Sequence, residues 1–157
     1  MKVRGINDYD IVNFRVPSLF IAFPYCSFKC DKDCGKPVCQ NSALVNEPII
    51  DVSIKYICEL YDKNPLTRAV VCGGLEPFDS FDDLQEFINA FRIAHDDIII
   101  IYTGYRALEI HSKVQQIQNC GNIIIKYGRY KPNTPSRYDD ILGITLASEN
   151  QYTVYYE

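Results

Sequence analysis

The sequence predicts an α/β protein built as an open, partial (β/α) barrel of parallel strands. Short apolar runs that fit buried strands alternate with segments of helical periodicity, and turn residues end each run. Four such units are too few to close a barrel of eight strands, so an open sheet is expected. At 157 residues the chain fits one domain, residues 1–157.

The first half of the chain predicts two strands and two helices. Residues 16–23 (VPSLFIAF) form an apolar run that stops at a proline, which fits a buried strand, and a cysteine-rich loop follows at 24–41. Apolar residues recur at helical spacing over 49–61 until an Asn-Pro pair breaks the pattern. Residues 67–72 (TRAVVC) predict a strand cut by two glycines, and a serine cap with two following aspartates predicts a helix over 80–95.

The second half of the chain continues the alternation of strands and helices and then ends in two successive strand candidates. Residues 98–102 (IIIIY) predict a third strand, 107–118 a helix ended by Asn-Cys-Gly, and 123–126 a fourth strand. Two late strand candidates, 142–147 and 152–156, flank a polar Ser-Glu-Asn-Gln segment and are expected to pair as a C-terminal hairpin. Functional loops are expected at the carboxyl ends of the parallel strands.

The charge and hydropathy of the chain limit which partners and which cellular compartment are expected. The net charge of −4 provides no broad basic surface, so nucleic acid is not an expected partner. No apolar run approaches the ~20 residues of a membrane-spanning helix, and the first residues lack the apolar core of a signal peptide. A cytoplasmic protein without a membrane partner is therefore expected.

Four cysteines fall within fourteen positions, in the segment CSFKCDKDCGKPVC. An odd total of seven cysteines without a secretion signal makes disulfides the weaker interpretation and a soft-metal site the stronger one. The spacing suits a structural zinc and an iron–sulfur cluster equally, with reduced thiols as the remaining alternative. Cys26 and Cys30 would be joined by Cys34, by Cys39, or by both.

Two more strand ends carry residues that suit a ligand. Gly73 and Gly74, followed by Glu76, would let the backbone approach an amino group closely. For two glycines alone an ordinary turn is the better interpretation, but their occurrence together with the cysteine segment favours a ligand site. Thr103 and Gly104 end the third strand and are open to the same two interpretations. Lys126 ends the fourth strand and would either neutralise a carboxylate or face solvent.

The cysteine segment and the later VVCGGLEPFDS together resemble the radical S-adenosylmethionine superfamily, whose signature is C-x3-C-x2-C with a later GGEP. More closely, the chain resembles the small activating enzymes of anaerobic ribonucleotide reductases. Three further stretches match: DYDIVNFRVPSLFIAF, IIIIYTGY and LASENQ. The resemblance thus spans nearly the whole chain and implies a partial barrel of the radical S-adenosylmethionine type.

Two departures from the family pattern concern the site. The family's cysteine spacing is tighter, and the GGEP motif here carries an inserted leucine before Glu76 and Pro77. In the family an apolar residue that lies against the adenine precedes the last cysteine, and an asparagine often follows; Val38-Cys39-Gln40-Asn41 fits this pattern. The resemblance therefore implies Cys26, Cys30 and Cys39 as ligands, with Cys34 as an extra thiol or a fourth ligand in a resting state.

The resemblance also implies an activity. A 4Fe-4S cluster with one open iron would bind S-adenosylmethionine and cleave it reductively to a 5′-deoxyadenosyl radical. That radical would generate a glycyl radical on a partner enzyme, most directly an anaerobic ribonucleotide reductase, with a flavodoxin- or ferredoxin-like protein as electron donor. The alternatives are a related enzyme that acts on another protein or peptide, and a non-catalytic cysteine-rich metal-binding module.

Overall fold

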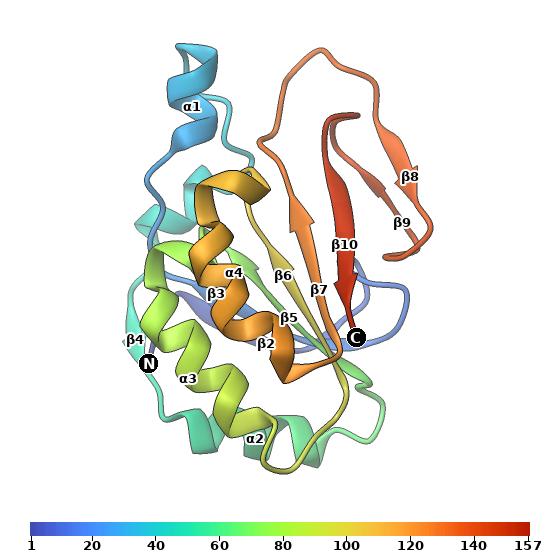
Figure 1. Cartoon of the computed structure of the whole chain (residues 1–157). Helices are drawn as coiled ribbons and strands as arrows, with labels where there is room; N and C mark the ends of the chain where they lie inside the picture. The colour runs from blue at the N-terminus through green and yellow to red at the C-terminus, as the bar shows by residue number, and fades with distance from the viewer.

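The computed structural model describes residues 1–157 and places one six-stranded sheet at the centre of the molecule (Figure 1). The strand order is β10-β7-β6-β5-β3-β2. The four inner strands run parallel to one another, and both outer strands run antiparallel to their neighbours. The inner strands are β3 (Ser18–Phe23), β5 (Ala69–Gly74), β6 (Ile98–Tyr102) and β7 (Ile123–Tyr127). The expected alternation is confirmed for these four strands, and the sheet stays open.

The two edge strands differ from the expectation. Strand β2 (Gly5–Asp10) lies in the polar start of the chain, where no strand was expected, because an edge strand exposed along much of its length needs no apolar run. The expected hairpin between 142–147 and 152–156 is wrong. Strand β10 (Tyr152–Tyr156) instead pairs with β7, and β9 (Ile144–Leu146) pairs with β8 (Arg137–Asp139).

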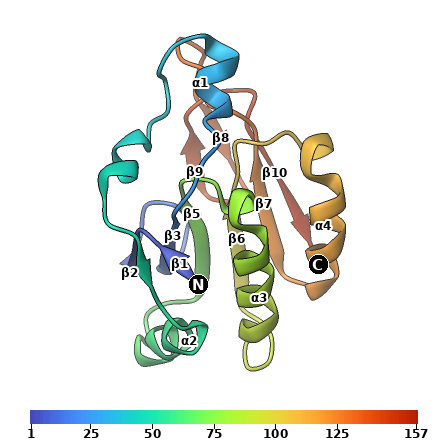
Figure 2. The same ribbon diagram turned by 90° about the vertical axis from the view of Figure 1, so that its left-hand side faces the viewer.

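Three helices cover one face of the sheet: α2 (Ile54–Lys63), α3 (Phe81–Phe91) and α4 (His111–Ile117) (Figure 2). Helix α2 starts later than expected because Ser53 caps it: the Ser53 Oγ accepts a bond of 3.1 Å from the Tyr56 N–H. Two residues expected in its first turn instead form β4 (Ile50–Asp51), which pairs with β1 (Lys2–Val3). Helix α4 is likewise shorter than expected, with single 3-10 turns before and after it.

The remaining regular elements are short. Helix α1 (Lys29–Cys34) lies within residues 24–41, called here the cysteine loop, beyond the carboxyl ends of the parallel strands (Figure 1). The 3-10 turns span Ser42–Asn46, Pro77–Ser80, Ala107–Ile110 and Gln118–Cys120. No helix is long and apolar enough to cross a membrane.

Alternate residues of the inner strands enter two separate apolar cores. Ile99 and Ile101 of β6 belong to the core of 21 buried residues under the helices, whereas Ile100 belongs to a core of seven on the opposite face. That smaller core lies between the sheet and the chain segments around Phe14, Leu142 and Leu146. Because apolar residues cover both faces, the strands read as continuous hydrophobic runs.

Candidate functional site

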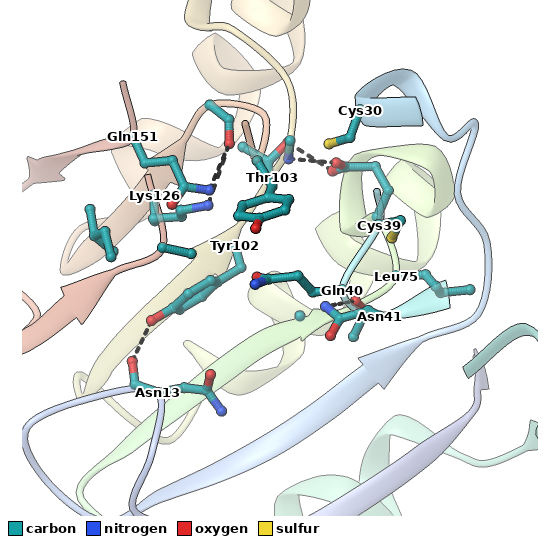
Figure 3. A pocket seen from close by; sticks show the side chains of 18 of the residues that line it. Asn13, Cys30, Cys39, Gln40, Asn41, Leu75, Tyr102, Thr103, Lys126 and Gln151 are labelled. Atoms are coloured by element: carbon teal, nitrogen blue, oxygen red, sulfur yellow. Dashed lines mark hydrogen bonds between the residues drawn. The ribbon is translucent and has the colours of Figure 1, made fainter. Parts of the chain in front are cut away.

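A cavity of about 540 Å³ opens at the carboxyl ends of β5, β6 and β7, on the face of the sheet that the helices leave free (Figure 3). Residues that end or follow these strands, such as Gly74, Thr103 and Lys126, line it together with part of the cysteine loop. In parallel sheets the carboxyl ends meet at one edge, which is where ligands bind in open α/β folds. The location expected from the sequence is therefore where the cavity lies.

Three of the four clustered cysteines line this cavity: Cys26, Cys30 and Cys39. Cys34 is the last residue of α1 and does not line it. Burial is the main cause that raises the pKa of the Cys26 thiol to about 12, and burial also raises the pKa of Cys30 and of Cys39. Because soft metals bind thiolates, loading a metal group here must release these protons.

Polar contacts rather than burial shape the cysteine loop. Helix α1 buries none of its residues, and Phe28 just before it adopts a left-handed conformation with φ 51° between the first two cysteines. The Asp31 carboxylate accepts bonds of 2.8 Å from the backbone N–H groups of Val38 and of Cys39. These bonds fold the end of the loop back so that Cys39 faces the same cavity as the first two cysteines.

An ion-pair network joins α1 to the loops that follow β6 and β7. Arg129, only 6 % exposed, makes two bonds of 2.7 Å to the Glu109 carboxylate, and its Nε lies 2.9 Å from an Asp33 oxygen as an ion pair. The hydrogen bonds from Arg129 lower the pKa of Glu109 to about 2. Lys29 and Arg106 lie at the margins, 3.6 Å from Glu109 and 3.3 Å from Asp33. The network thus ties α1 to the loops that follow β6 and β7.

The glycine pair serves the packing of strands as well as the cavity. Gly74 has φ 78°, and a Cβ there would lie 2.8 Å from the Ala22 Cα in β3. The space that a side chain would need at Gly74 is therefore filled by the neighbouring strand, while the backbone of Gly73 and Gly74 lines the cavity. The Gly74 carbonyl accepts a bond of 2.7 Å from the Asn41 side chain, which ties the cysteine loop to β5 (Figure 3).

Glu76 is a buried carboxylate that organises the neighbouring strand end. Its oxygens accept bonds from the Thr103 hydroxyl at 2.8 Å, the Gly104 N–H at 2.9 Å and the Phe78 N–H at 3.2 Å. Burial outweighs these bonds and raises the pKa of Glu76 to about 7. A Cβ on Gly104 would lie 3.4 Å from the Cys30 sulfur, so this turn forms the wall beside that thiol.

Lys126 places a buried ammonium group at the cavity. The residue is 8 % exposed, and its Nζ has one hydrogen-bond acceptor, the Gly128 carbonyl, at 3.4 Å. Burial lowers the pKa of Lys126 to about 8, and the charges that Cys30 and Glu76 can carry nearby partly offset this effect. An ammonium with such weak compensation favours a negatively charged group in the cavity.

Besides Cys34, two expected site residues lie outside the cavity lining. Val38 is partly exposed, and Pro77 is buried at the start of a 3-10 turn. The lining also contains residues that the sequence analysis did not assign to the site. Among them are Tyr102, whose hydroxyl donates to the Asn13 carbonyl at 2.6 Å, and Gln151, whose side chain bonds the Gly128 carbonyl at 3.2 Å. The only sequence signal for either residue was its position in a stretch that resembles the family, IIIIYTGY for Tyr102 and LASENQ for Gln151.

The arrangement of donors indicates what the cavity can hold. No three His, Cys, Asp or Glu side chains are grouped closely enough to hold a single metal ion. An iron–sulfur cluster distributes its thiolates over different irons, so its ligands lie further apart than those of one ion. Three thiols on the wall of one cavity fit such a cluster, and the rest of the cavity leaves room for a ligand beside it.

Comparison with known families agrees with this chemistry. A family model described as "4Fe-4S single cluster domain" matches residues 15–152, which include the cysteine loop and all four inner strands. Neither the comparison with curated proteins nor that with solved structures finds a significant match.

Proposed function

Because this chain belongs to the 4Fe-4S single-cluster domain family, we propose that its cluster serves a radical S-adenosylmethionine activase. Cys26, Cys30 and Cys39 are the proposed ligands, and Cys34 is not required. The observation that carries the proposal is that these three cysteines share one cavity with a buried lysine. Three thiolates leave one iron of the cluster without a protein ligand, as in catalytic metal sites that keep an open position.

When bound, the cluster would supply the electron that splits S-adenosylmethionine into methionine and a 5′-deoxyadenosyl radical, which takes a hydrogen atom from a glycine α-carbon of the partner. The protein's residues bind and orient the reactants. The Lys126 ammonium pairs with the carboxylate of the methionine moiety, the contact that its burial and weak hydrogen bonding favour. Glu76 holds Thr103 and Gly104 in place beside Cys30.

The size of the cavity supports a protein substrate. A volume of about 540 Å³ would be largely taken up by the cluster and one cofactor-sized ligand. A second small molecule would need further enclosed space, whereas a glycine on a protein loop needs only an opening. Together with the resemblance of the chain to the activating enzymes, this supports an anaerobic ribonucleotide reductase as the proposed substrate, on which the glycyl radical would be generated, with a flavodoxin- or ferredoxin-like electron donor.

Anaerobic reconstitution tests the proposal. The protein is loaded with iron and sulfide, reduced in the presence of S-adenosylmethionine, and assayed for 5′-deoxyadenosine. Electron paramagnetic resonance then follows the reductase for a glycyl radical. Formation of both products is expected, and Lys126→Met is expected to weaken cofactor binding at least tenfold in calorimetry while it keeps the cluster. A reconstituted protein that releases no 5′-deoxyadenosine would contradict the proposal.

A further inference from the structure

Strand β9 has one edge that pairs with no other strand. It forms a two-stranded sheet with β8, in which Arg137 lies opposite Leu146 and Asp139 opposite Ile144. In an antiparallel pair every second residue directs its N–H and C=O away from the partner strand. The outer edge of β9 therefore offers a short row of backbone donors and acceptors.

This free edge lies on the wall of the site cavity. Four consecutive residues line the cavity: Ile144, Thr145, Leu146 and Ala147. Side chains of a strand alternate between its two faces, and here Leu146 is buried in the smaller core while Thr145 is exposed. Consecutive residues can all meet the cavity only if the backbone edge between the two faces is turned toward it.

The loop before β3 forms a second wall near β9. The Arg15 N–H donates to the Leu142 carbonyl at 2.8 Å, so the loop and the hairpin are joined just before β9 begins. Beyond this bond Val12 and Asn13 line the cavity from the loop side, and the Tyr102 hydroxyl holds Asn13 in place. Ile11 and Val12 are 63 % and 71 % exposed. A slot results, with a polar backbone wall along β9 and an apolar side along the loop.

We propose that the β9 edge binds an extended backbone segment of the partner protein by adding it as a third strand to the β8–β9 sheet. A row of donors and acceptors that repeats every ~3.3 Å is matched by another polypeptide backbone. The exposed Ile11 and Val12 would cover the side chains of that segment. The proposal rests on the proposed function, because the strand so bound places the partner's glycine beside the cavity that holds the three cysteines.

Hydrogen exchange provides the first test, with the reconstituted, cofactor-loaded protein mixed with the glycyl-radical reductase from the same source. Amide exchange over residues 143–148 is expected to slow at least tenfold in the complex. Strand β2 is the internal control, because it is also an edge strand but none of its residues lines the cavity. Glycyl-radical formation without protection at 143–148 would overturn this inference and leave the proposed function intact. Neither protection nor radical would overturn both.

A matched pair of variants provides the second test. Thr145→Pro removes the N–H at the centre of β9, and Thr145→Ala removes the same side chain but keeps the N–H. Activation of the reductase is expected to fall at least tenfold in Thr145→Pro and less than twofold in Thr145→Ala. Circular dichroism and iron content establish that both proteins are folded and loaded. Equal activation by the two loaded variants would overturn backbone pairing at this position.

Discussion

The two parts of the site are held in opposite ways. The floor of the site, residues 73–76 at the end of β5, is entirely buried, and pairing of β5 with β3 fixes the backbone where this segment begins. The cysteine loop buries no residue of α1 and is held by the Asp31 bonds, the Asn41 bond and the Arg129 network. The floor is therefore organised by the hydrophobic core, whereas the loop depends on polar contacts and on the group that its thiols bind.

Removing single thiols should have the largest effect, because it acts on the group that the cysteine loop binds. Cys39→Ala is expected to abolish cluster binding, because the loop then offers only two of the three proposed thiolate ligands. Cys34→Ala should retain most of the cluster, since Cys34 does not line the cavity. Iron and sulfide content with visible absorbance after reconstitution measures both. A cluster that survives in Cys39→Ala and disappears in Cys34→Ala would assign the third ligand to Cys34.

Two glycines with positive φ allow the tightness of packing in the floor and in the cysteine loop to be compared. Gly74→Ala should cost about 3 kcal/mol or more, since the new Cβ meets Ala22 in a left-handed conformation. Gly35→Ala, at the end of α1, has φ 66° but nothing within 4 Å of its Cβ, so its cost should be about 1 kcal/mol. Urea unfolding of the metal-free proteins gives both values, and equal losses would contradict the account of a tightly packed floor.

Disrupting the ion-pair network should have a smaller effect on stability than Gly74→Ala. Arg129→Gln leaves Glu109 and Asp33 without their shared partner and is expected to cost about 2 kcal/mol, with faster hydrogen exchange across α1. The control is Arg106→Gln, because Arg106 touches the same Asp33 but its side chain is 69 % exposed, and its loss should cost less than ~0.5 kcal/mol. If α1 exchanges at the same rate in both variants, the network does not hold the loop.

The most gradual expected effect is a dependence of stability on pH within the floor. Glu76 has its pKa raised by burial from 4.5 to about 7, so between these values the folded protein keeps a proton that the unfolded chain has lost. Its stabilising contribution is thus complete below pH 4.5 and is lost as the pH rises through about 7, at no more than about 1.4 kcal/mol per pH unit. Stability curves of the wild type and Glu76→Gln should diverge in slope over this range; parallel curves would contradict the raised pKa.

The sequence predicted the inner sheet well and its edges poorly. Strands β3, β5, β6 and β7 are buried on both faces, so each had to be a continuous apolar run that periodicity can find. Strand β2 is partly exposed and carries no such run. The pairing of β10 with β7 joins segments about 25 residues apart across the β8–β9 hairpin, and local turn chemistry contains no information about that choice.

For the site, too, the sequence predicted one part well and another poorly: the location of the cavity could be predicted, but the contacts of single residues could not. Cysteine spacing and the Gly-Gly pair located the cavity, because strand ends converge wherever parallel strands do. The contacts of individual residues were harder to predict: Ala22 fills the space beside Gly74, and Glu76 accepts hydrogen bonds from three groups of the protein. Arg129 had no signal at all, since its partners come from two other loops.

The burial that raises the pKa of Cys26, Cys30 and Cys39 has a consequence for the newly made chain. Oxidants and alkylating agents attack the thiolate, and at neutral pH these three side chains are overwhelmingly in the thiol form. They should therefore react slowly while they wait for iron and sulfide. The burial of these thiols in the cavity thus protects them from oxidation, and it extends the time during which the metal-free protein can still bind a cluster.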